Sequence, residues 1–504
     1  MQALKQIVFL LDGNKLAKID IIDTGKSKSR HTQFYHLIKN GTIQTDEDAV
    51  LHFYKTKNVQ DSRYRYFKNT FRNKLINTIF FVNTHDEKVG NYQNTYTDAQ
   101  RTWALINILF TRSAFVAAID LSEQLLKICL HYEFTELVVQ LTDKLKHIHG
   151  TLKGDKEKFA YFRELHFKHL AHLNTELLVK DYYQTVKIEY TKTIGFKREM
   201  QAVADKAIEE LAPHVSKCDT FTFMSIWYLL RVTSYQTIYD HKNILAVCEE
   251  GINFFNQKKF ETSKVTAILM NQQLISQIQL RQYEAGKKTA LAVEALQIEG
   301  THNWYKSLEQ QMMLAFHTRT YGQAYTIYQI ATKHKGFAYL EGRNKEIWPL
   351  FSAYLYFLIK MKRIEGIALE KSGLKDFKIQ KFSNALNEIS ADKNGLNIPY
   401  LIINYLIQLL NKNEDKLIDG VEAMQKYIMR HVKKTDAAYR TNLFLKLLTR
   451  TTELDYSKNA IKPFADKLIN EMAESPPNIM EQGDRIEIMS FEYMWDEMQV
   501  LLEE

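Results

Sequence analysis

The chain has 504 residues with only 6 prolines and 18 glycines, and its 67 lysines and arginines against 59 acidic residues give a net charge of +8. Because proline and glycine serve tight turns, this composition excludes collagen-like and Pro/Gly-rich disordered chains and disfavours a many-stranded sandwich or barrel. With 45% hydrophobic residues there is ample material for a core. We therefore expect a long all-α protein made of several domains or of an elongated repeat array.

Membrane spans, signal peptides and cysteine patterns together indicate the cellular compartment of a protein. No window approaches the ~18 consecutive apolar residues of a membrane span, and Asp12 ends the N-terminal apolar run before it reaches the length of a signal-peptide core. The three cysteines, Cys129, Cys218 and Cys248, share no short spacing. This is the usage of a reducing compartment, with neither a zinc pattern nor a disulfide framework. The sequence predicts a cytoplasmic protein without membrane insertion.

Residues 1–81 are predicted to form a small basic N-terminal domain. Its first part, residues 4–22, fits two helices or a hairpin that turns at Asp12-Gly13, and the pattern leaves both open. A helix is expected to end at Gly41. Thr45 and Asp48 then have the spacing of an N-terminal cap on a short helix.

The last helix of this domain is predicted over residues 62–81. Its apolar positions recur at helical spacing and should form one buried face: Tyr64, Phe67, Phe71, Leu75 and Ile79. Residues 82–98 are polar and aperiodic, so we predict a linker there.

Residues 99–474 are predicted to form a helical-repeat array of antiparallel hairpins, because most connections between the helical segments are only 2–6 residues long. A longer irregular stretch is expected at 372–398. The predicted pairs are 99–130 with 133–149, 158–173 with 176–192, 220–239 with 242–257, 263–280 with 283–298, 303–318 with 321–334, 346–361 with 364–371, 399–411 with 414–432, and 438–454 with 458–474.

One hairpin resembles a tetratricopeptide unit. Tyr321, Ala324, Tyr328 and Ala331 have the spacing of the second helix of that repeat, in which a small residue lets two helices approach and a large one fills the gap to the next hairpin. The same frame recurs more loosely as Tyr283/Gly286/Ala290/Val293, as Leu417/Gly420/Met424/Tyr427 and as Phe134/Leu137/Leu141/Lys144. The spacing of the units is uneven, and the first-helix pattern of the family is largely missing. The resemblance implies a degenerate, tetratricopeptide-like α-solenoid and does not imply a ligand class.

A basic cluster surrounds the start of the helix predicted at 62–81. Aromatic residues are interleaved with it, and Arg65, Lys68 and Arg72 should form one stripe that could lie along a phosphate backbone. The alternative is a solvated cationic flank of an amphipathic helix. The candidate residues for binding a nucleic acid or an acidic partner are Lys55, Lys57, Arg63, Arg65, Lys68, Arg72 and Lys74.

The C-terminal segment differs from the rest. Ser475-Pro476-Pro477 should break the helix series, and residues 484–504 carry seven acids against Arg485. Their apolar positions fit either a helix that docks on a partner or on another copy, or a cap folded onto the last repeat, which we favour. The opposite charges of the two chain ends also permit self-association. The candidate docking residues are Ile488, Phe491, Met494, Trp495, Met498 and Leu501.

Other candidate sites are weaker. His166, His169 and His172 lie three apart on a predicted helix, so adjacent pairs can share a face but all three cannot converge on one metal ion. No phosphate-binding glycine motif and no nucleophile motif occurs in the sequence. We therefore predict no catalytic residues, no bound metal and no cofactor.

Together these patterns predict a non-enzymatic scaffold or adaptor that grips a protein partner on the concave face of the repeats. One alternative is a nucleic-acid-associated regulator that binds phosphates through the helix at 62–81. Another is a structural subunit of a larger defence or secretion assembly. The residues predicted to line the concave face are Tyr228, Tyr235, Asn271, Gln272, Ser276, Gln311 and Arg319.

Overall fold

The computed structural model divides into two compact units, Met1–Cys129 and Leu130–Glu504, and each unit is described by itself. The segment at 4–22 apart from Gln6, the first part of the linker and Pro476-Pro477 lie outside the described residues. The structure describes residue 6 and residues 29–79, 91–192, 198–340, 343–374, 397–431, 436–474 and 487–502.

The protein is all-α. Of the residues that the structure describes, 81% are helical and none lies in a β-strand. Its 20 described α-helices pack against their neighbours in the chain in a repeat-like way. No helix in the described ranges is long and apolar enough to cross a membrane.

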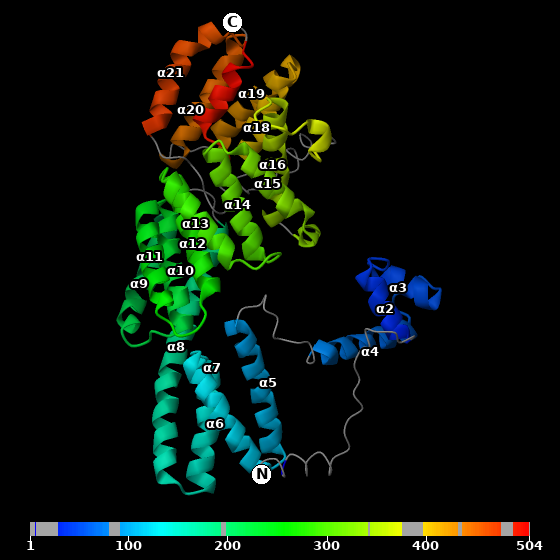
Figure 1. Cartoon of the computed structure of the whole chain (residues 1–504), viewed down its shortest axis with the longest axis vertical. Coiled ribbons are helices and arrows are strands. Elements are labelled where there is room, and N and C mark those ends of the chain that lie inside the picture. Colours follow the sequence, from blue (N-terminus) through cyan, green and yellow to red (C-terminus); the bar gives the residue numbers. More distant parts are fainter. Residues whose placement is uncertain are drawn as a thin grey trace. The chain divides into compact units, whose positions relative to one another are not determined.

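Three helices form a small domain within the first unit (Figure 1): α2 at Arg30–Lys39, α3 at Asp46–Tyr54 and α4 at Ser62–Ile79. Helix α2 ends where we predicted, because Gly41 has a φ of +71° and the amides of Gly41 and Thr42 donate to the carbonyls of Ile38 and Leu37. The predicted cap of α3 is confirmed as a capping box, in which Thr45 and Asp48 each accept a hydrogen bond from the backbone of the other.

An aromatic core holds these helices together. Phe34 of α2 packs against Phe67 and Phe71 of α4, with ring centroids 5.5 and 4.6 Å apart. Tyr64 of α4 is also buried and donates its hydroxyl to Asp46 Oδ1 at 2.6 Å. The predicted buried face of α4 is therefore confirmed at Tyr64, Phe67 and Phe71.

The next two helices correct our element boundaries. Helix α5 spans Asn91–Thr111 and α6 spans Phe115–His131, where we predicted a single helix at 99–130. Ser113 adopts a φ of 60° and ends α5, a break without glycine or proline that the sequence pattern does not reveal. Residues 91–98 of the predicted linker are helical.

The second unit begins with α7 at Thr135–His147, followed by a π-helical turn at Ile148–Leu152. Helix α8 then runs without interruption through Lys156–Lys192, so the predicted pair at 158–173 and 176–192 is wrong. Helix α9 at Arg198–Val215 lies where we predicted no element.

The remaining helices agree with the predicted segments to within a few residues, with two exceptions: 364–371 holds only a 3-10 turn at Leu369–Lys371, and α22 is shorter than the predicted C-terminal segment at 484–504. A second 3-10 turn lies at Lys335–Tyr339. The helices are α10 at Phe221–Thr237, α11 at His241–Asn256, α12 at Ser263–Gln279, α13 at Tyr283–Leu296, α14 at His302–His317, α15 at Tyr321–Lys333, α16 at Arg343–Lys360, α18 at Asn397–Leu410, α19 at Glu414–His431, α20 at Asp436–Glu453, α21 at Lys458–Glu474 and α22 at Phe491–Gln499.

One turn geometry recurs after the first helix of successive hairpins. In each case a non-glycine residue adopts the left-handed conformation, with φ between 52° and 59°, and the next amide donates to a carbonyl five residues earlier. This satisfies the free carbonyls of the helix end and starts the second helix at once. The residues in this position are Tyr239, Arg281, Arg319, Lys362 and Lys412.

The first helices of the hairpins form the interior of the second unit. In α14 every residue from Ser307 to His317 is buried, and α12 and α16 are also buried on most sides. The second helices, such as α13 and α15, bury a single face. Contacts between α10 and α12, between α12 and α14, and between α14 and α16 link the first helices into one layer.

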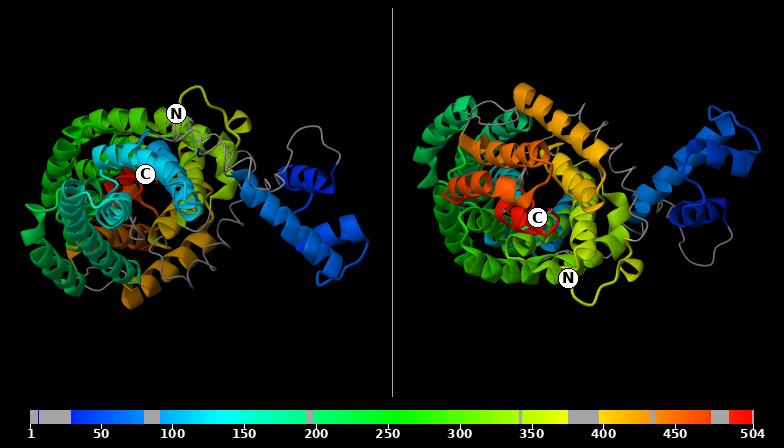
Figure 2. Two further views of the ribbon diagram at one scale, coloured as in Figure 1. Left: turned by 90° about the horizontal axis from the view of Figure 1, so that it is seen from below. Right: turned by 90° about the horizontal axis from the view of Figure 1, so that it is seen from above.

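The C-terminal segment 487–502 is enclosed by helices of the second unit in Figure 2 (red). Phe491 stacks on Phe444 of α20 with ring centroids 4.4 Å apart. The hairpin turns supply cations to its acids: Arg319 pairs with Asp496, and Arg363 Nε donates to Glu497 at 2.6 Å.

A buried ion pair fixes the start of this segment. The guanidinium of Arg440 donates two hydrogen bonds to the carboxylate of Glu487, at 2.9 and 2.7 Å, and the two side chains are 2% and 0% exposed. The same guanidinium pairs with Glu492. Burial works against ionisation of Glu492, but the hydrogen bond and charge of Arg440 outweigh it and lower the pKa of Glu492 to about 2.

We expect the turn after α16 to tolerate glycine better than valine. Lys362 has a φ of 57°, a conformation that costs a β-branched residue about 1–2 kcal/mol and glycine almost nothing. Lys362→Val should lower the urea midpoint measured by circular dichroism, and Lys362→Gly should leave it unchanged or raise it. Lys288 is exposed inside α13 and serves as the control. There Lys288→Gly should lower the urea midpoint more than Lys288→Val, because glycine is the poorer helix former. Equal midpoints for both variants at Lys362 would contradict the turn geometry.

The pairing of Glu492 predicts a pH-dependent stability. Its folded pKa lies below the ordinary value, so it stabilises the protein above about pH 4.5, and this contribution is lost as the pH falls toward 2. Glu492→Gln should reduce the free energy of unfolding by about 1–3 kcal/mol at pH 7, with a difference from wild type that shrinks between pH 5 and pH 2. Glu453→Gln, which removes an exposed pair with Arg450, should cost under about 1 kcal/mol. A Glu492→Gln difference that stays constant with pH would show that the pair contributes nothing as a charge.

Candidate functional site

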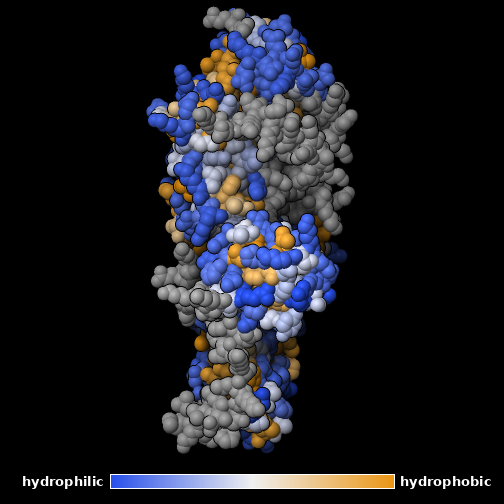
Figure 3. All heavy atoms as spheres, turned by 90° about the vertical axis from the view of Figure 1, so that its right-hand side faces the viewer, coloured by the Kyte–Doolittle hydropathy of each residue, from blue (hydrophilic) through white to orange (hydrophobic). Residues whose placement is uncertain are grey.

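Positive charge gathers on the three-helix domain. Residues 29–79 contain nine lysines and arginines against four acids, and α4 holds five of these cations and no acid. The domain faces the viewer in Figure 3, where its surface is hydrophilic for the most part. The acids lie mainly at the start of α3, where they cap that helix.

Some cations of the predicted basic cluster are paired with an acidic side chain, and others are exposed without an ion pair to any described residue. Arg63 pairs with Asp61 at 2.8 Å and holds the pKa of that carboxyl at about 2. Lys68 pairs with Asp46 at 2.6 Å, and this hydrogen bond, together with that of Tyr64, lowers the pKa of Asp46. Lys74 is half-buried. The exposed cations of the cluster that form no ion pair within the described ranges are Lys55, Lys57, Arg65 and Arg72.

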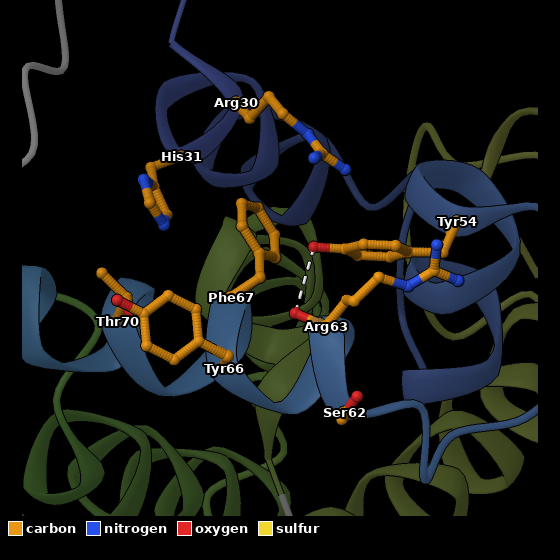
Figure 4. Close-up of a pocket in the computed structure, with 8 residues that line it drawn as sticks. All are labelled: Arg30, His31, Tyr54, Ser62, Arg63, Tyr66, Phe67 and Thr70. Atoms are coloured by element: carbon orange, nitrogen blue, oxygen red, sulfur yellow. Dashed lines mark hydrogen bonds between the residues drawn. The ribbon is translucent and has the colours of Figure 1, made fainter.

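An open cleft of about 560 Å³ lies between α2, the end of α3 and the first half of α4 (Figure 4). Its volume falls in the range of ligand-binding pockets. Its lining combines two guanidinium groups, aromatic rings and hydroxyl groups: Arg30, His31, Tyr54, Ser62, Arg63, Tyr66, Phe67 and Thr70.

The two arginines of the cleft are held in place by Tyr54. The Cζ atoms of Arg30 and Arg63 lie 4.9 and 5.5 Å from the centroid of its ring, which is cation–π distance. The hydroxyl of Tyr54 donates to the Arg63 carbonyl at 3.2 Å, as drawn in Figure 4, and Arg30 donates to the Phe53 carbonyl at 3.1 Å. The guanidinium of Arg30 is thus oriented before any ligand arrives and keeps free donors for an anion, whereas that of Arg63 also donates to Asp61 at 3.2 and 2.8 Å.

The other rings of the cleft differ in their exposure. His31 stacks on Phe67, with centroids 4.7 Å apart and an interplanar angle of 11°. Tyr66 at the rim is 76% exposed, although it belongs to the same helix as the buried Phe67. Sequence reasoning missed Arg30, His31 and Tyr54, because only the packing of α2 and α3 on α4 brings them to the basic cluster.

The predicted concave-face residues do not form an open surface. Polar residues of this set bond with neighbouring helices: Gln272 with Gln236 at 2.6 Å and Ser276 with His241 at 3.1 Å. Tyr235 is half-buried, and Arg319, the exposed member, pairs with Asp496. The members that are buried, and that correct this prediction, are Tyr228, Asn271, Gln272, Ser276 and Gln311.

The predicted docking helix is also covered by its own chain. Leu501 is half-buried, and the rest of the apolar face lies in the core. Helix α22 is folded onto its own chain, and its apolar face is not open to a partner, which corrects the docking alternative. It contacts the turns after α14 and α16 as well as α20, so it is not simply a cap on the last repeat. The buried residues are Ile488, Phe491, Met494, Trp495 and Met498.

The histidines of α8 lie in different surroundings. His166 is buried and bonds to Thr142 and to the Val139 carbonyl, whereas His169 and His172 are half-buried with ring centroids 5.3 Å apart. Burial lowers the pKa of His169 to about 4. No group of three or more histidine, cysteine or acidic side chains suited to a metal ion occurs in the described ranges. All three cysteines are buried.

Comparison with known proteins gives no further guide to the site. No protein-family model matches the chain, and no curated protein or solved structure matches it either.

Proposed function

We propose that this protein is a non-enzymatic scaffold that binds nucleic acid through its three-helix domain. We further propose that its hairpins form a degenerate tetratricopeptide-like solenoid that serves as the frame. The solenoid part is supported by the repeated turn and by small residues at helix contacts. A methyl group at Gly251 of α11 would lie 2.8 Å from Leu269 of α12 and 3.0 Å from Tyr228 of α10, which is too close for a side chain unless these neighbours shift.

The observation that carries the nucleic-acid proposal is the set of exposed cations beside the cleft that have no acidic partner among the residues that the structure describes. Arg65 and Arg72 of α4 are exposed, and Arg30 is stacked on the ring of Tyr54. Guanidinium groups offer several donors in one plane, which suits the oxygens of a phosphate. Several such groups on one small domain match a ligand with regularly spaced phosphates.

An acidic protein segment would satisfy the same charges, but it would leave the rings unused. Tyr66 exposes 76% of its surface beside the cleft, and an exposed ring among cations suits a nucleic acid, whose groove offers apolar methyl groups as well as polar base edges and phosphates. We therefore favour nucleic acid over an acidic protein.

The proposal is tested by titrating fluorescent single-stranded and duplex DNA and RNA of about 30 nucleotides with the full chain at 50 and 200 mM KCl. We expect affinity to fall steeply with salt. The double variant Arg65→Ala/Arg72→Ala should reduce the slope of log K against log salt by about 1.5, because each lost phosphate contact removes about 0.7–0.9.

The matched control removes two exposed lysines of the second unit, Lys242 and Lys288, and should leave the slope unchanged. Poly-glutamate serves as the competitor that represents an acidic protein. Absence of binding at 50 mM KCl, an equal slope for the Arg65/Arg72 variant, or complete competition by poly-glutamate at equal charge would refute the proposal.

A further inference from the structure

The buried face of α4 determines which residues point away from the domain. Tyr64, Phe67 and Phe71 are buried against the other two helices. Each residue of an α-helix is rotated about 100° from the one before it, so residues 66, 69 and 73 lie on the opposite side. The side chains there are Tyr66, Asn69 and Asn73, and all three are exposed.

Cations lie on both flanks of this outward row. Arg65 and Arg72 are seven residues apart and therefore share one flank. Arg63, which is paired with Asp61, and Thr70 share the other flank, which borders the cleft. The cation of this flank without an acidic partner in the described part of the chain is Arg30, which lines the cleft from α2 beside Tyr54 (Figure 4). The outward side of α4 thus has two amide side chains in its middle and positive charge along both edges.

We propose that α4 is a recognition helix that enters the major groove of duplex DNA. This inference rests on the proposed function, since it names the kind of nucleic acid that the same domain binds. A helix with its side chains is about 10–12 Å across, and the major groove is about 12 Å wide. Asn69 and Asn73 face the base edges, where an asparagine amide pairs with the N6 and N7 atoms of adenine. Arg65 and Arg72 contact the phosphates of one strand, and Arg30 at the cleft contacts those of the other.

The anchoring of α4 supports this role, because a reading helix must be held rigidly. Asp46 at the start of α3 accepts hydrogen bonds from Tyr64 at 2.6 Å and from Lys68 at 2.6 and 2.8 Å. These contacts join α3 to two successive turns of α4, while Phe34 of α2 packs on the next turn at Phe71. The side chains proposed to contact phosphates and those proposed to contact bases are thereby held at fixed positions relative to one another.

The cleft favours a duplex over a single strand. Single-strand binding relies on successive aromatic faces on which unpaired bases stack. Here the ring of Tyr54 has guanidinium groups over it, and Phe67 is stacked against His31. Tyr66 is the one ring of the cleft that is mostly exposed, which is too few for a stacking platform.

The experiment selects bound sequences from a pool of duplex 30-mers with a randomised centre, using the full chain. We expect wild type to enrich a short motif that contains adenine and to bind the selected duplex more tightly than either of its single strands. Asn69→Ala/Asn73→Ala should weaken binding to the selected duplex about 10- to 100-fold, with the salt slope and the affinity for unselected duplex within twofold of wild type.

The matched control, Asn253→Ala/Asn256→Ala, removes two exposed asparagines of α11 and should bind as wild type. Thermal melts identify a variant that fails to fold; in that case Asn69→Leu/Asn73→Leu replaces it, with loss of the motif as the expected result, because leucine is of similar size and cannot hydrogen-bond to a base. Binding without an enriched motif, tighter binding of the single strand, or an Asn69/Asn73 variant equal to wild type would overturn the recognition helix and leave the proposed function standing. No binding to any nucleic acid would refute the proposed function itself.

Discussion

The packing of Tyr64, Phe67 and Phe71 against α2 and α3 determines which side of α4 meets solvent. These three rings are buried, and burying an aromatic side chain of this size stabilises a fold by roughly 1.5–3 kcal/mol. A rotation of α4 that turned its cations inward would bury charge and expose the rings, so the arrangement is strongly constrained. The exposed asparagines, the cationic flanks and the cleft all follow from this one contact face.

The second unit depends on a different constraint, which is the backbone conformation of the residue that connects the two helices of each hairpin. A left-handed residue after the first helix closes the free carbonyls and lets the second helix start almost immediately, and side chains as large as Tyr239 and Arg281 adopt it. Glycine would adopt this conformation more easily. The scarcity of glycine in the chain therefore does not mean that left-handed turns are rare in it. At Arg319 the same position also serves the C-terminal segment, because its guanidinium reaches Asp496.

The periodicity of apolar residues was sufficient to predict most helices of the second unit and the buried face of α4. The periodicity did not predict features that depend on contacts between residues far apart in the sequence. Helix α8 continues through Glu176, where we expected a break; this buried carboxylate accepts hydrogen bonds from Thr135 and Thr220, which lie far away in the sequence. The cleft was missed for the same reason, since Arg30 and Tyr54 meet the basic cluster only through the packing of the three helices.

The polar residues that we predicted to line the concave face are for the most part buried between helices. Gln272 and Ser276 are buried and satisfied by side chains of neighbouring helices. A buried polar group needs such a partner, and helices packed in layers provide one. Sequence alone shows the polar group and not the partner that makes its burial tolerable.

Contact between α4 and the bases of a duplex is tested by photo-crosslinking from the full chain with a photoreactive amino acid in place of Asn69. Our account predicts crosslinks to bases of the bound duplex from this position, and none from the same amino acid in place of Asn253 on α11. Crosslinks that are absent at position 69 while the variant still binds the duplex would contradict it.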